Sequence, residues 1–124
     1  MSRYSTRLPK NFEQANEMLG KREERKLINN TYAIRGGNGR VNIVHHNSAI
    51  ATFEPDGEVT LTNAGYGSVS TRERLNAMTP WNLGFVQKNH AQMILLKGSG
   101  DVEDWTYTPG GTVVIAPDGT VSIP

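Results

Sequence analysis

The sequence predicts a mainly β (α+β) fold, a small antiparallel sandwich or barrel-like meander with an N-terminal helix and one short internal helix. Three observations indicate this class. Short apolar stretches alternate with polar residues at the period of two that half-buried strands have. Gly, Pro, Asn and Asp residues separate these stretches at short intervals, as turns do in sandwiches and barrels. Helical periodicity is confined to two segments, at about residues 11–28 and 70–78.

The composition fits one small domain with many turns. The chain has 124 residues, of which 13 are glycine, and a hydrophobic fraction of 36%. Because this fraction is low, we expect a thin core and a homo-oligomer in which subunits complete it. Cysteine is absent, which excludes disulfides and thiolate chemistry. No apolar stretch approaches the roughly 20 residues that cross a bilayer, and the first residues lack a secretion signal, so we expect no membrane partner.

We divide the chain into a charged N-terminal arm and helix, residues 1–28, and a β-rich domain, residues 29–124. Residues 1–26 carry seven Lys or Arg side chains against four Glu, a net charge of +3, whereas the remainder carries −2. Asn11 is placed to cap the first turn of a helix over residues 11–28, and Gly20 kinks or ends the first half of that helix. A basic arm can contact nucleic acid, and a solvated helix is the alternative interpretation.

Turn residues and alternation predict the strands. Residues 36–39 (Gly-Gly-Asn-Gly) indicate a hairpin, since Gly and Asn adopt positive φ without strain. Residues 55–57 and 117–119 are both Pro-Asp-Gly and predict two turns of the same chemistry, and residues 98–100 predict another turn. The expected strands are residues 31–35, 40–45, 49–54, 58–62, 83–88, 92–97, 102–108, 112–116 and 120–123.

A short helix is expected at about residues 70–78. Ser70 followed by Glu73 has the spacing of a capping box, in which the Ser side chain caps the helix. Thr79 and Pro80 then end the helix, because proline restricts the residue before it to extended conformations.

Five segments carry a family resemblance. They are Leu27-Ile28-Asn29-Asn30-Thr31-Tyr32, His46-Asn47-Ser48-Ala49-Ile50, Phe53-Glu54-Pro55-Asp56-Gly57-Glu58-Val59-Thr60-Leu61, Gly65-Tyr66-Gly67-Ser68-Val69 and Ser70-Thr71-Arg72-Glu73-Arg74-Leu75-Asn76. In order and spacing they resemble a family of small proteins encoded by bacteriophages, over about residues 27–78. The chain departs from the family pattern at Ser48, at residues 64–66 and at residues 70–72, where the family has Thr, Gly-Gly-Trp and Thr-Thr-Lys. The resemblance implies a viral gene product acting in the host cytoplasm and no particular activity.

Glycines, hydroxyls and arginines cluster between residues 65 and 76 and suggest a phosphate site. Glycines let the backbone approach a ligand, the start of a helix attracts anions, and Arg pairs with phosphate oxygens. An aromatic ring beside them can stack on a base. The expected ligand-binding residues are Gly65, Tyr66, Gly67, Ser68, Ser70, Thr71, Arg72, Arg74 and Asn76. The alternative is an ordinary capped helix with two solvated arginines.

Histidine chemistry has a weaker basis in the sequence. Neighbouring residues on a strand point to opposite faces, so His45 and His46 are not expected to share one ligand. His46 is a weak catalytic candidate, because it could reach the loop at residues 65–74. We expect no metal and no cofactor, since Cys is absent and the three His lack ligand spacing. A serine nucleophile lacks both the elbow motif and an evident base partner.

Aromatic residues interleaved with cations form a second candidate surface. Small β domains bind single strands by stacking bases on such rings. The candidates are Tyr32, Tyr66, Trp81, Phe85, Trp105 and Tyr107, with Arg35, Arg40, Lys88 and Lys97. The alternative is that most of these rings pack in the core.

These observations leave three functions open. The first is a phage accessory protein that binds nucleic acid or a phosphate-bearing nucleotide. The second is an interaction factor, either an inhibitor of a host or defence protein or a self-assembling component, because exposed strand edges and an amphipathic arm favour contacts with protein. The third and weakest is a phosphodiester hydrolase using His46, Arg72 and Arg74.

Overall fold

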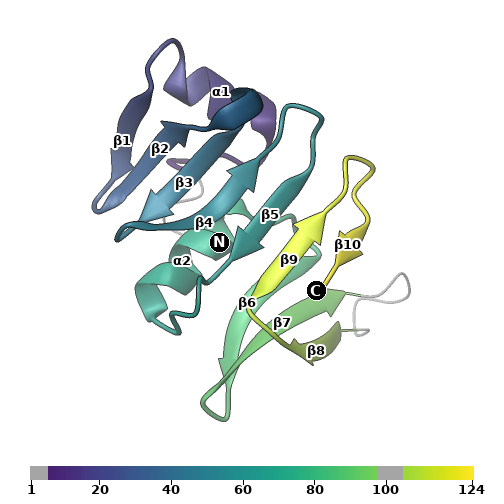
Figure 1. Cartoon of the computed structure of the whole chain (residues 1–124). Helices are drawn as coiled ribbons and strands as arrows, with labels where there is room; N and C mark the ends of the chain where they lie inside the picture. Colours follow the sequence, from purple (N-terminus) through teal and green to yellow (C-terminus); the bar gives the residue numbers. More distant parts are fainter. Residues whose placement is uncertain (1–5, 98–104) are drawn as a thin grey trace.

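The computed structural model describes residues 6–97 and 105–124 and contains two antiparallel sheets and two α-helices in those residues (Figure 1). The large sheet has the spatial order β1 (Glu24–Ile28), β2 (Thr31–Arg35), β3 (Val41–His45), β4 (Ser48–Phe53), β5 (Val59–Thr62), β9 (Thr112–Ile115) and β10 (Val121–Ser122). The small sheet has the order β6 (Leu83–Lys88), β7 (Ala91–Lys97) and β8 (Trp105–Pro109). The helices are α1 (Phe12–Leu19) and α2 (Val69–Met78), with a 3₁₀ turn at Gly37–Gly39. This confirms the expected mainly β fold with an N-terminal and an internal helix.

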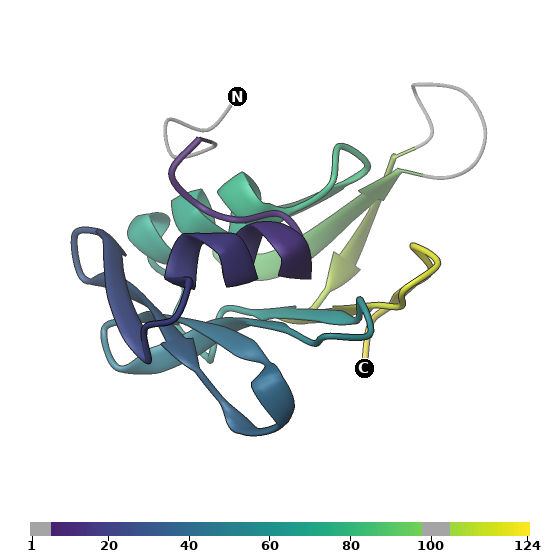
Figure 2. The same cartoon turned by 90° about the horizontal axis from the view of Figure 1, so that it is seen from above.

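Both helices cover the same face of the large sheet, which is where the core lies (Figure 2). Alternate residues of the strands point to this face and are fully buried, among them Ala33, Ile43 and Leu61. The inner face of the small sheet, with Phe85 and Ile94, belongs to the same buried cluster. One apolar cluster therefore joins both sheets and both helices.

The expected helix over residues 11–28 is wrong in its second half. α1 ends at Leu19, because Gly20 has φ 63° and directs its own N–H to the carbonyl of Asn16. Arg35 then donates to the Gly20 carbonyl, a cation at the carbonyl end of the helix. Residues Glu24–Ile28 form β1, whose charged residues line a sheet edge that a neutral sequence would leave open to pairing.

The predicted turns are confirmed where the structure describes them. In both Pro-Asp-Gly turns the Asp side chain accepts a backbone N–H two residues later at 2.9 Å, and the Gly has φ of 104° or 94°. Gly57 sits against Pro117, so the two turns also contact each other. The turn expected at residues 98–100 and the start of the strand expected at 102–108 lie outside the described residues.

The cap of α2 differs from expectation. Ser68, and not Ser70, is the N-cap, since its Oγ accepts the Thr71 N–H at 3.2 Å. The helix begins at Val69, which leaves Ser70 within the first turn with its hydroxyl available for other contacts.

A pairing between strands that are distant in the sequence completes the large sheet. β5 pairs with β9, so the chain leaves the sheet after Thr62 and re-enters at Thr112. Two contacts join these points: the Thr62 and Thr112 hydroxyls lie 2.7 Å apart, and Asn63 N–H donates to the Gly111 carbonyl at 2.8 Å. The segment between them contains α2 and the small sheet.

Candidate functional site

A cavity of about 320 Å³ lies at the N-terminal end of α2, against the turn between β3 and β4. Seven residues line it: His45, His46, Ile50, Tyr66, Ser68, Ser70 and Thr71. Four of them belong to the ligand-binding set expected from sequence, and His46 lines the same cavity as these four. The cavity therefore gathers one phenol ring, two imidazoles and three aliphatic hydroxyls.

The two histidines face one cavity, contrary to the expectation that they lie on opposite faces. His46 is not on a strand: it has φ 49°, and Asn47 has φ 68°, the values of a two-residue hairpin turn. The turn brings the ring of His46 back toward His45, with 4.2 Å between the ring centroids. The rule that neighbouring strand residues point to opposite faces failed here, because it assumed that β3 continues through residue 46.

A β-bulge supplies the apolar wall. Ile43 pairs with Ala51 and Val44 with Ala49, which leaves Ile50 as the extra residue of β4. Ile50 and Ala51 are consequently both buried, although neighbours on a strand normally alternate. Sequence alternation alone could not place Ile50 in the cavity.

His45 is the most constrained polar group in the cavity. It is 3% exposed and lies directly opposite Thr31 across the β2–β3 pair. Its Nδ1 is 3.2 Å from the carbonyl of Asn30 and 3.2 Å from Thr31 Oγ1, and its Nε2 is 3.3 Å from Ser70 Oγ.

These contacts assign the proton on the neutral ring. The Asn30 carbonyl can only accept, and the Thr31 hydroxyl already donates to the Asn29 carbonyl at 3.0 Å. Nδ1 must therefore carry the hydrogen, and Nε2 is left as an acceptor for the Ser70 hydroxyl. Burial lowers the pKa of His45 below 6.5, and the positive charge of Arg74 and the neighbouring His46 act in the same direction, outweighing the Asn30 carbonyl, which favours the charged form. His45 is consequently neutral at pH 7.

Arg74 lies beneath the cavity and holds this arrangement. It is 4% exposed, and its guanidinium donates to Thr31 Oγ1 at 2.7 Å, to the Asn29 carbonyl at 2.9 Å and to the Ser70 carbonyl at 3.0 Å. Ser70 and Arg74 are four residues apart and so share the face of α2 that meets the large sheet. Arg74 therefore links the helix to the β1–β2 turn and to β2.

The other expected site residues turn toward the small sheet. Arg72 donates to the Gly67 carbonyl, Gln87 and Gln92 at 2.8 to 3.3 Å. Asn76 donates to the Phe85 carbonyl at 2.9 Å and accepts the Phe85 N–H at 2.7 Å, which fixes α2 to β6.

Glycine is required at residues 65 and 67 for two different structural reasons. Gly65 has φ 84° in the turn that follows β5. A Cβ on Gly67 would stand 2.7 Å from the Gln92 side chain, so Gly67 lets the loop lie against β7. Neither observation involves the cavity.

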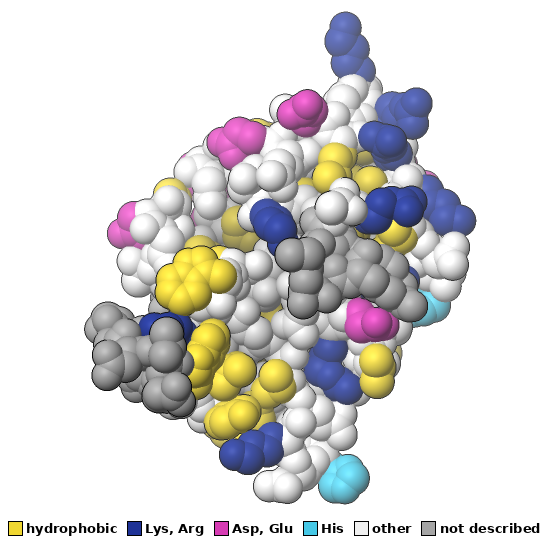
Figure 3. Space-filling view, turned by 180° about the vertical axis from the view of Figure 1, so that it is seen from behind, with side chains coloured by type: hydrophobic (Ala, Val, Ile, Leu, Met, Phe, Trp, Pro, Cys, Tyr) yellow, Lys and Arg dark blue, Asp and Glu magenta, His cyan; other side chains and the backbone are white. Residues whose placement is uncertain are grey.

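A second candidate surface is the outer face of the small sheet. Strand pairing puts Val86 and Lys88 of β6, Met93, Leu95 and Lys97 of β7, and Trp105 and Tyr107 of β8 on one side. The Lys88 amine lies 4.1 Å from the centre of the Tyr107 ring, and the Lys97 amine lies 5.5 Å from that of Trp81. Hydrophobic side chains gather over this part of the molecule with basic groups beside them (Figure 3). We call this set, with Trp81, the outer aromatic face.

Three aromatic side chains on this face are exposed to an unusual extent. Trp81 is 78% exposed, Tyr107 47% and Trp105 38%. Large rings in water contribute little to folding, and neighbouring exposed rings are typical of surfaces that contact another molecule.

The remaining members of the aromatic set expected from sequence lie elsewhere. Phe85 is 3% exposed and belongs to the core, while Tyr66 lines the cavity and Tyr32 lies on the large sheet. Arg35 holds the end of α1, and Arg40 pairs with Glu54 at 3.3 Å. The face is therefore smaller than the sequence suggested.

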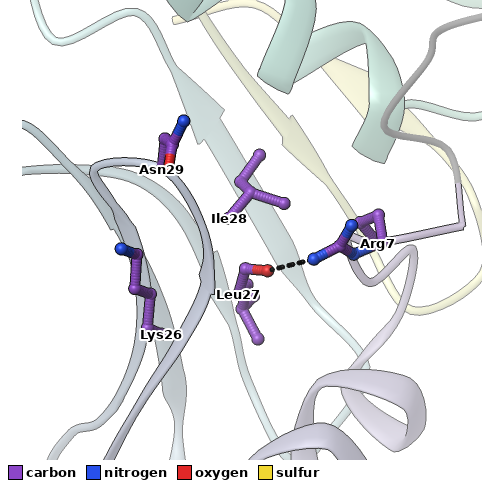
Figure 4. Close-up of a pocket in the computed structure, with 5 residues that line it drawn as sticks. All are labelled: Arg7, Lys26, Leu27, Ile28 and Asn29. Carbon is purple, nitrogen blue, oxygen red and sulfur yellow. Dashed lines mark hydrogen bonds between the residues drawn. The ribbon is translucent and has the colours of Figure 1, made fainter.

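The N-terminal arm forms another hollow, of about 420 Å³, with strand β1 (Figure 4). Arg7 and Lys26 line it, and Arg7 donates to the Leu27 carbonyl at 3.2 Å. Lys10 similarly donates to the Ala77 carbonyl at 2.6 Å. The Lys10 contact therefore attaches the arm to the β-rich domain, and the Arg7 contact holds the start of the arm against β1.

Among the described residues, no three acidic or histidine side chains are grouped so that they could hold a metal ion. Neither helix in that part of the chain has the length and apolarity needed to span a bilayer.

Comparison with known proteins places the chain in a phage family. The model of the family described as Kyanoviridae Gp96 protein matches residues 8–113, and the chain belongs to this family. The match extends beyond both ends of the resemblance at residues 27–78, and it includes α1 and the small sheet. Searches of curated proteins and of solved structures find no match.

Proposed function

We propose that this Kyanoviridae Gp96 protein binds single-stranded nucleic acid on its outer aromatic face. The observation that carries the proposal is the exposure of Trp81, Trp105 and Tyr107 on one surface with lysine amines over two of the rings. Exposed rings stack on unpaired bases, and nearby cations contact the phosphates that join them. A phage protein with this activity would act on nucleic acid in the host cytoplasm.

The geometry suits a single strand better than a duplex. Trp105 and Tyr107 belong to β8, and Trp81 lies two residues before β6 with the Lys97 amine of β7 5.5 Å from its ring. Stacking on these rings needs no groove and no projecting helix. Bases in a duplex are already stacked on each other and cannot lie flat on protein rings without being unpaired. A net charge of +1 also argues against the strong nonspecific field of a duplex-coating protein.

One feature of the same face favours a second candidate, self-association. Val86, Met93 and Leu95 are half-buried aliphatic residues between the rings, as in the centre of a protein interface. A second copy of the chain covering this face would make the protein a self-assembling component.

Fluorescence anisotropy with a labelled oligothymidylate tests the proposal. We expect binding that weakens with salt, and about a tenfold or larger loss on Trp81→Ala or Tyr107→Ala, because each stacked base contributes about 1–3 kcal/mol. Lys88→Gln is expected to lower the slope of log affinity against log salt by about 0.7, the contribution of one phosphate contact on a single strand. A duplex of the same length is expected to bind more weakly.

The matched control is Tyr66→Ala, which removes an aromatic ring that is 57% exposed on a different surface. It is expected to leave oligonucleotide binding unchanged.

Solution mass measurement separates the two candidates. A dimer or larger assembly that dissociates on Trp81→Ala, together with no oligonucleotide binding, would establish self-association instead. Equal loss of binding in Tyr66→Ala and Trp81→Ala would contradict the assignment to the outer aromatic face.

A further inference from the structure

We propose that Ser70 is a nucleophile, that His45 is its general base, and that the cavity around them accepts a small, largely apolar acyl ester. The sequence alone indicated no base for a serine nucleophile, whereas the structure places His45 Nε2 3.3 Å from Ser70 Oγ. This activity lies beyond nucleic-acid binding and uses a different surface, so either proposal can fail without the other.

The three groups stand in the order that serine activation requires. Ser70 Oγ–H donates to His45 Nε2, and His45 Nδ1–H donates to the Asn30 carbonyl at 3.2 Å. The carbonyl fixes the tautomer, so the nitrogen that faces the serine is the one that can take its proton. A distance of 3.3 Å is within the looser range seen for such pairs before substrate binds.

The imidazole is neutral and therefore competent as a base at pH 7. Two charged or titratable groups face it: Arg74 of α2 and His46 of the β3–β4 turn. Both disfavour the protonated ring, and burial does so most strongly. A histidine held this way accepts a proton transiently and returns it readily.

The reacting groups are held rigidly from below. Arg74 donates to the Ser70 carbonyl and to Thr31 Oγ1, and the Thr31 hydroxyl itself donates to the Asn29 carbonyl. Arg74 thereby fixes the backbone of the nucleophile and the strand opposite the base in one network. It is a positioning residue, because it does not line the cavity.

The walls indicate the class of substrate. Ile50 and the ring of Tyr66 are apolar. The Ser68 hydroxyl lies 3.3 Å from that of Ser70 and 2.8 Å from that of Thr71. A volume of about 320 Å³ holds a short acyl chain and excludes a large lipid. Among the residues that the structure describes, no side chain of fixed charge lines it, which favours a neutral ester over a phosphate ester.

The reaction balances with water as the second substrate. Ser70 Oγ bonds to the acyl carbon, its proton passes to His45 Nε2, and the ester C–O bond breaks as that proton moves to the leaving alcohol. Water then attacks the acyl carbon, the bond between that carbon and Ser70 Oγ breaks as His45 carries the proton of water to Oγ, and the carboxylic acid leaves.

A fluorophosphonate probe tests the nucleophile directly. In this reaction an Oγ–P bond forms, the P–F bond breaks with loss of fluoride, and His45 takes the serine proton. We expect the intact mass to rise by one adduct, peptide mapping to place it on Ser70, and Ser70→Ala to prevent it. Protein unfolded in urea is expected to react at least 100-fold more slowly, since activation by a positioned base contributes about 10²–10⁴.

The dependence of the labelling rate on pH, measured on the unsubstituted protein, tests whether His45 is the base. The rate is expected to be level at neutral pH and to fall only below 6.5, as His45 becomes protonated. His45→Gln is expected to slow labelling at least 100-fold, with the fold checked by circular dichroism. Absence of an adduct on native protein, an adduct at another residue, or a rate that does not depend on folding would overturn the proposal.

Discussion

Small domains usually bury apolar side chains and expose polar ones, and two regions of this molecule do the opposite. One is the set of buried polar side chains between α2 and the large sheet, which we call the region beneath α2. The other is the outer aromatic face. Beneath α2, Thr31, His45 and Arg74 are at most 4% exposed, and each has hydrogen-bonding partners within the protein. On the outer aromatic face, the largely apolar rings of Trp81, Trp105 and Tyr107 are exposed to solvent. One region hides polar atoms and the other exposes rings.

The difference shows which side chains the fold depends on. A buried cation and its acceptors are costly when one partner is removed, because the others lose their bonds out of reach of water. An exposed ring loses little when it is removed. Stability should therefore concentrate beneath α2, while the outer aromatic face should be replaceable without unfolding.

The largest expected effect is that of Arg74→Met. It removes the three hydrogen bonds that the buried guanidinium donates to Thr31 Oγ1 and to the carbonyls of Asn29 and Ser70, and we expect the free energy of unfolding to fall by about 3 kcal/mol. Urea denaturation measures this loss. Lys21→Met is the exposed control and should change stability by less than about 0.5 kcal/mol. A similar small change in Arg74→Met would remove the distinction between the two regions.

Asn76→Ala should have the next largest effect. It deprives both the N–H and the carbonyl of Phe85 of their partner, and the expected loss is about 2 kcal/mol. Gln87→Ala also removes an amide between α2 and the small sheet, but an exposed one, so it should cost less than about 0.5 kcal/mol. The midpoint of thermal unfolding of the two variants compares a buried amide with an exposed one. Equal shifts of the midpoint would contradict the view that stability depends mainly on the buried polar groups.

Acidification should lower the free energy of unfolding through His45, in the region beneath α2, and by less than these two substitutions. The pKa of His45 lies below 6.5 in the folded protein because of burial, Arg74 and His46, so the unfolded chain binds a proton first as the pH falls. Stability is therefore expected to be complete above pH 6.5 and to decrease below it. His45→Gln should lack this part of the pH dependence, as followed by urea denaturation between about pH 5.5 and 7.5. An identical profile in both proteins would place the titration elsewhere.

Trp81→Ala should have the smallest effect on stability. The ring is 78% exposed, and the Lys97 amine 5.5 Å from its centre contributes about 0.5 kcal/mol at an exposed site. A loss above about 1.5 kcal/mol would mean that the fold needs this ring, and the outer aromatic face would then lose its contrast with the region beneath α2.

Sequence reasoning succeeded where a few consecutive residues determine the structure. The Pro-Asp-Gly turns, the hairpin at residues 36–39 and most strands follow from local backbone preferences. It failed at residues 24–28, where charge and spacing fit a helix but pairing with β2 makes a strand. Pairing between strands overrides local propensity, and no short window of sequence contains it.

The candidate site was only partly predictable for the same reason. The window at residues 65–76 was chosen by composition, and helical geometry directs its members to different sides. Ser70 and Arg74 face the large sheet, while Arg72 and Asn76 face the small sheet. Spacing of four along a helix already separates these pairs. The partnership of Ser70 with His45 depends on how α2 sits on β3, which only the structure shows.

The pairing of β5 with β9 has a consequence for how the chain acquires its structure. The Thr62 and Thr112 side chains that meet there are 50 residues apart, so joining them costs about 3 kcal/mol of loop entropy before any bond forms. Strands β1 to β5 follow one another along the chain and can assemble early, whereas β9 must wait for α2 and the small sheet to shorten the distance. During synthesis, β5 therefore remains an open sheet edge, accessible to chaperones or to other nascent chains, until Ile115 has emerged and folded back.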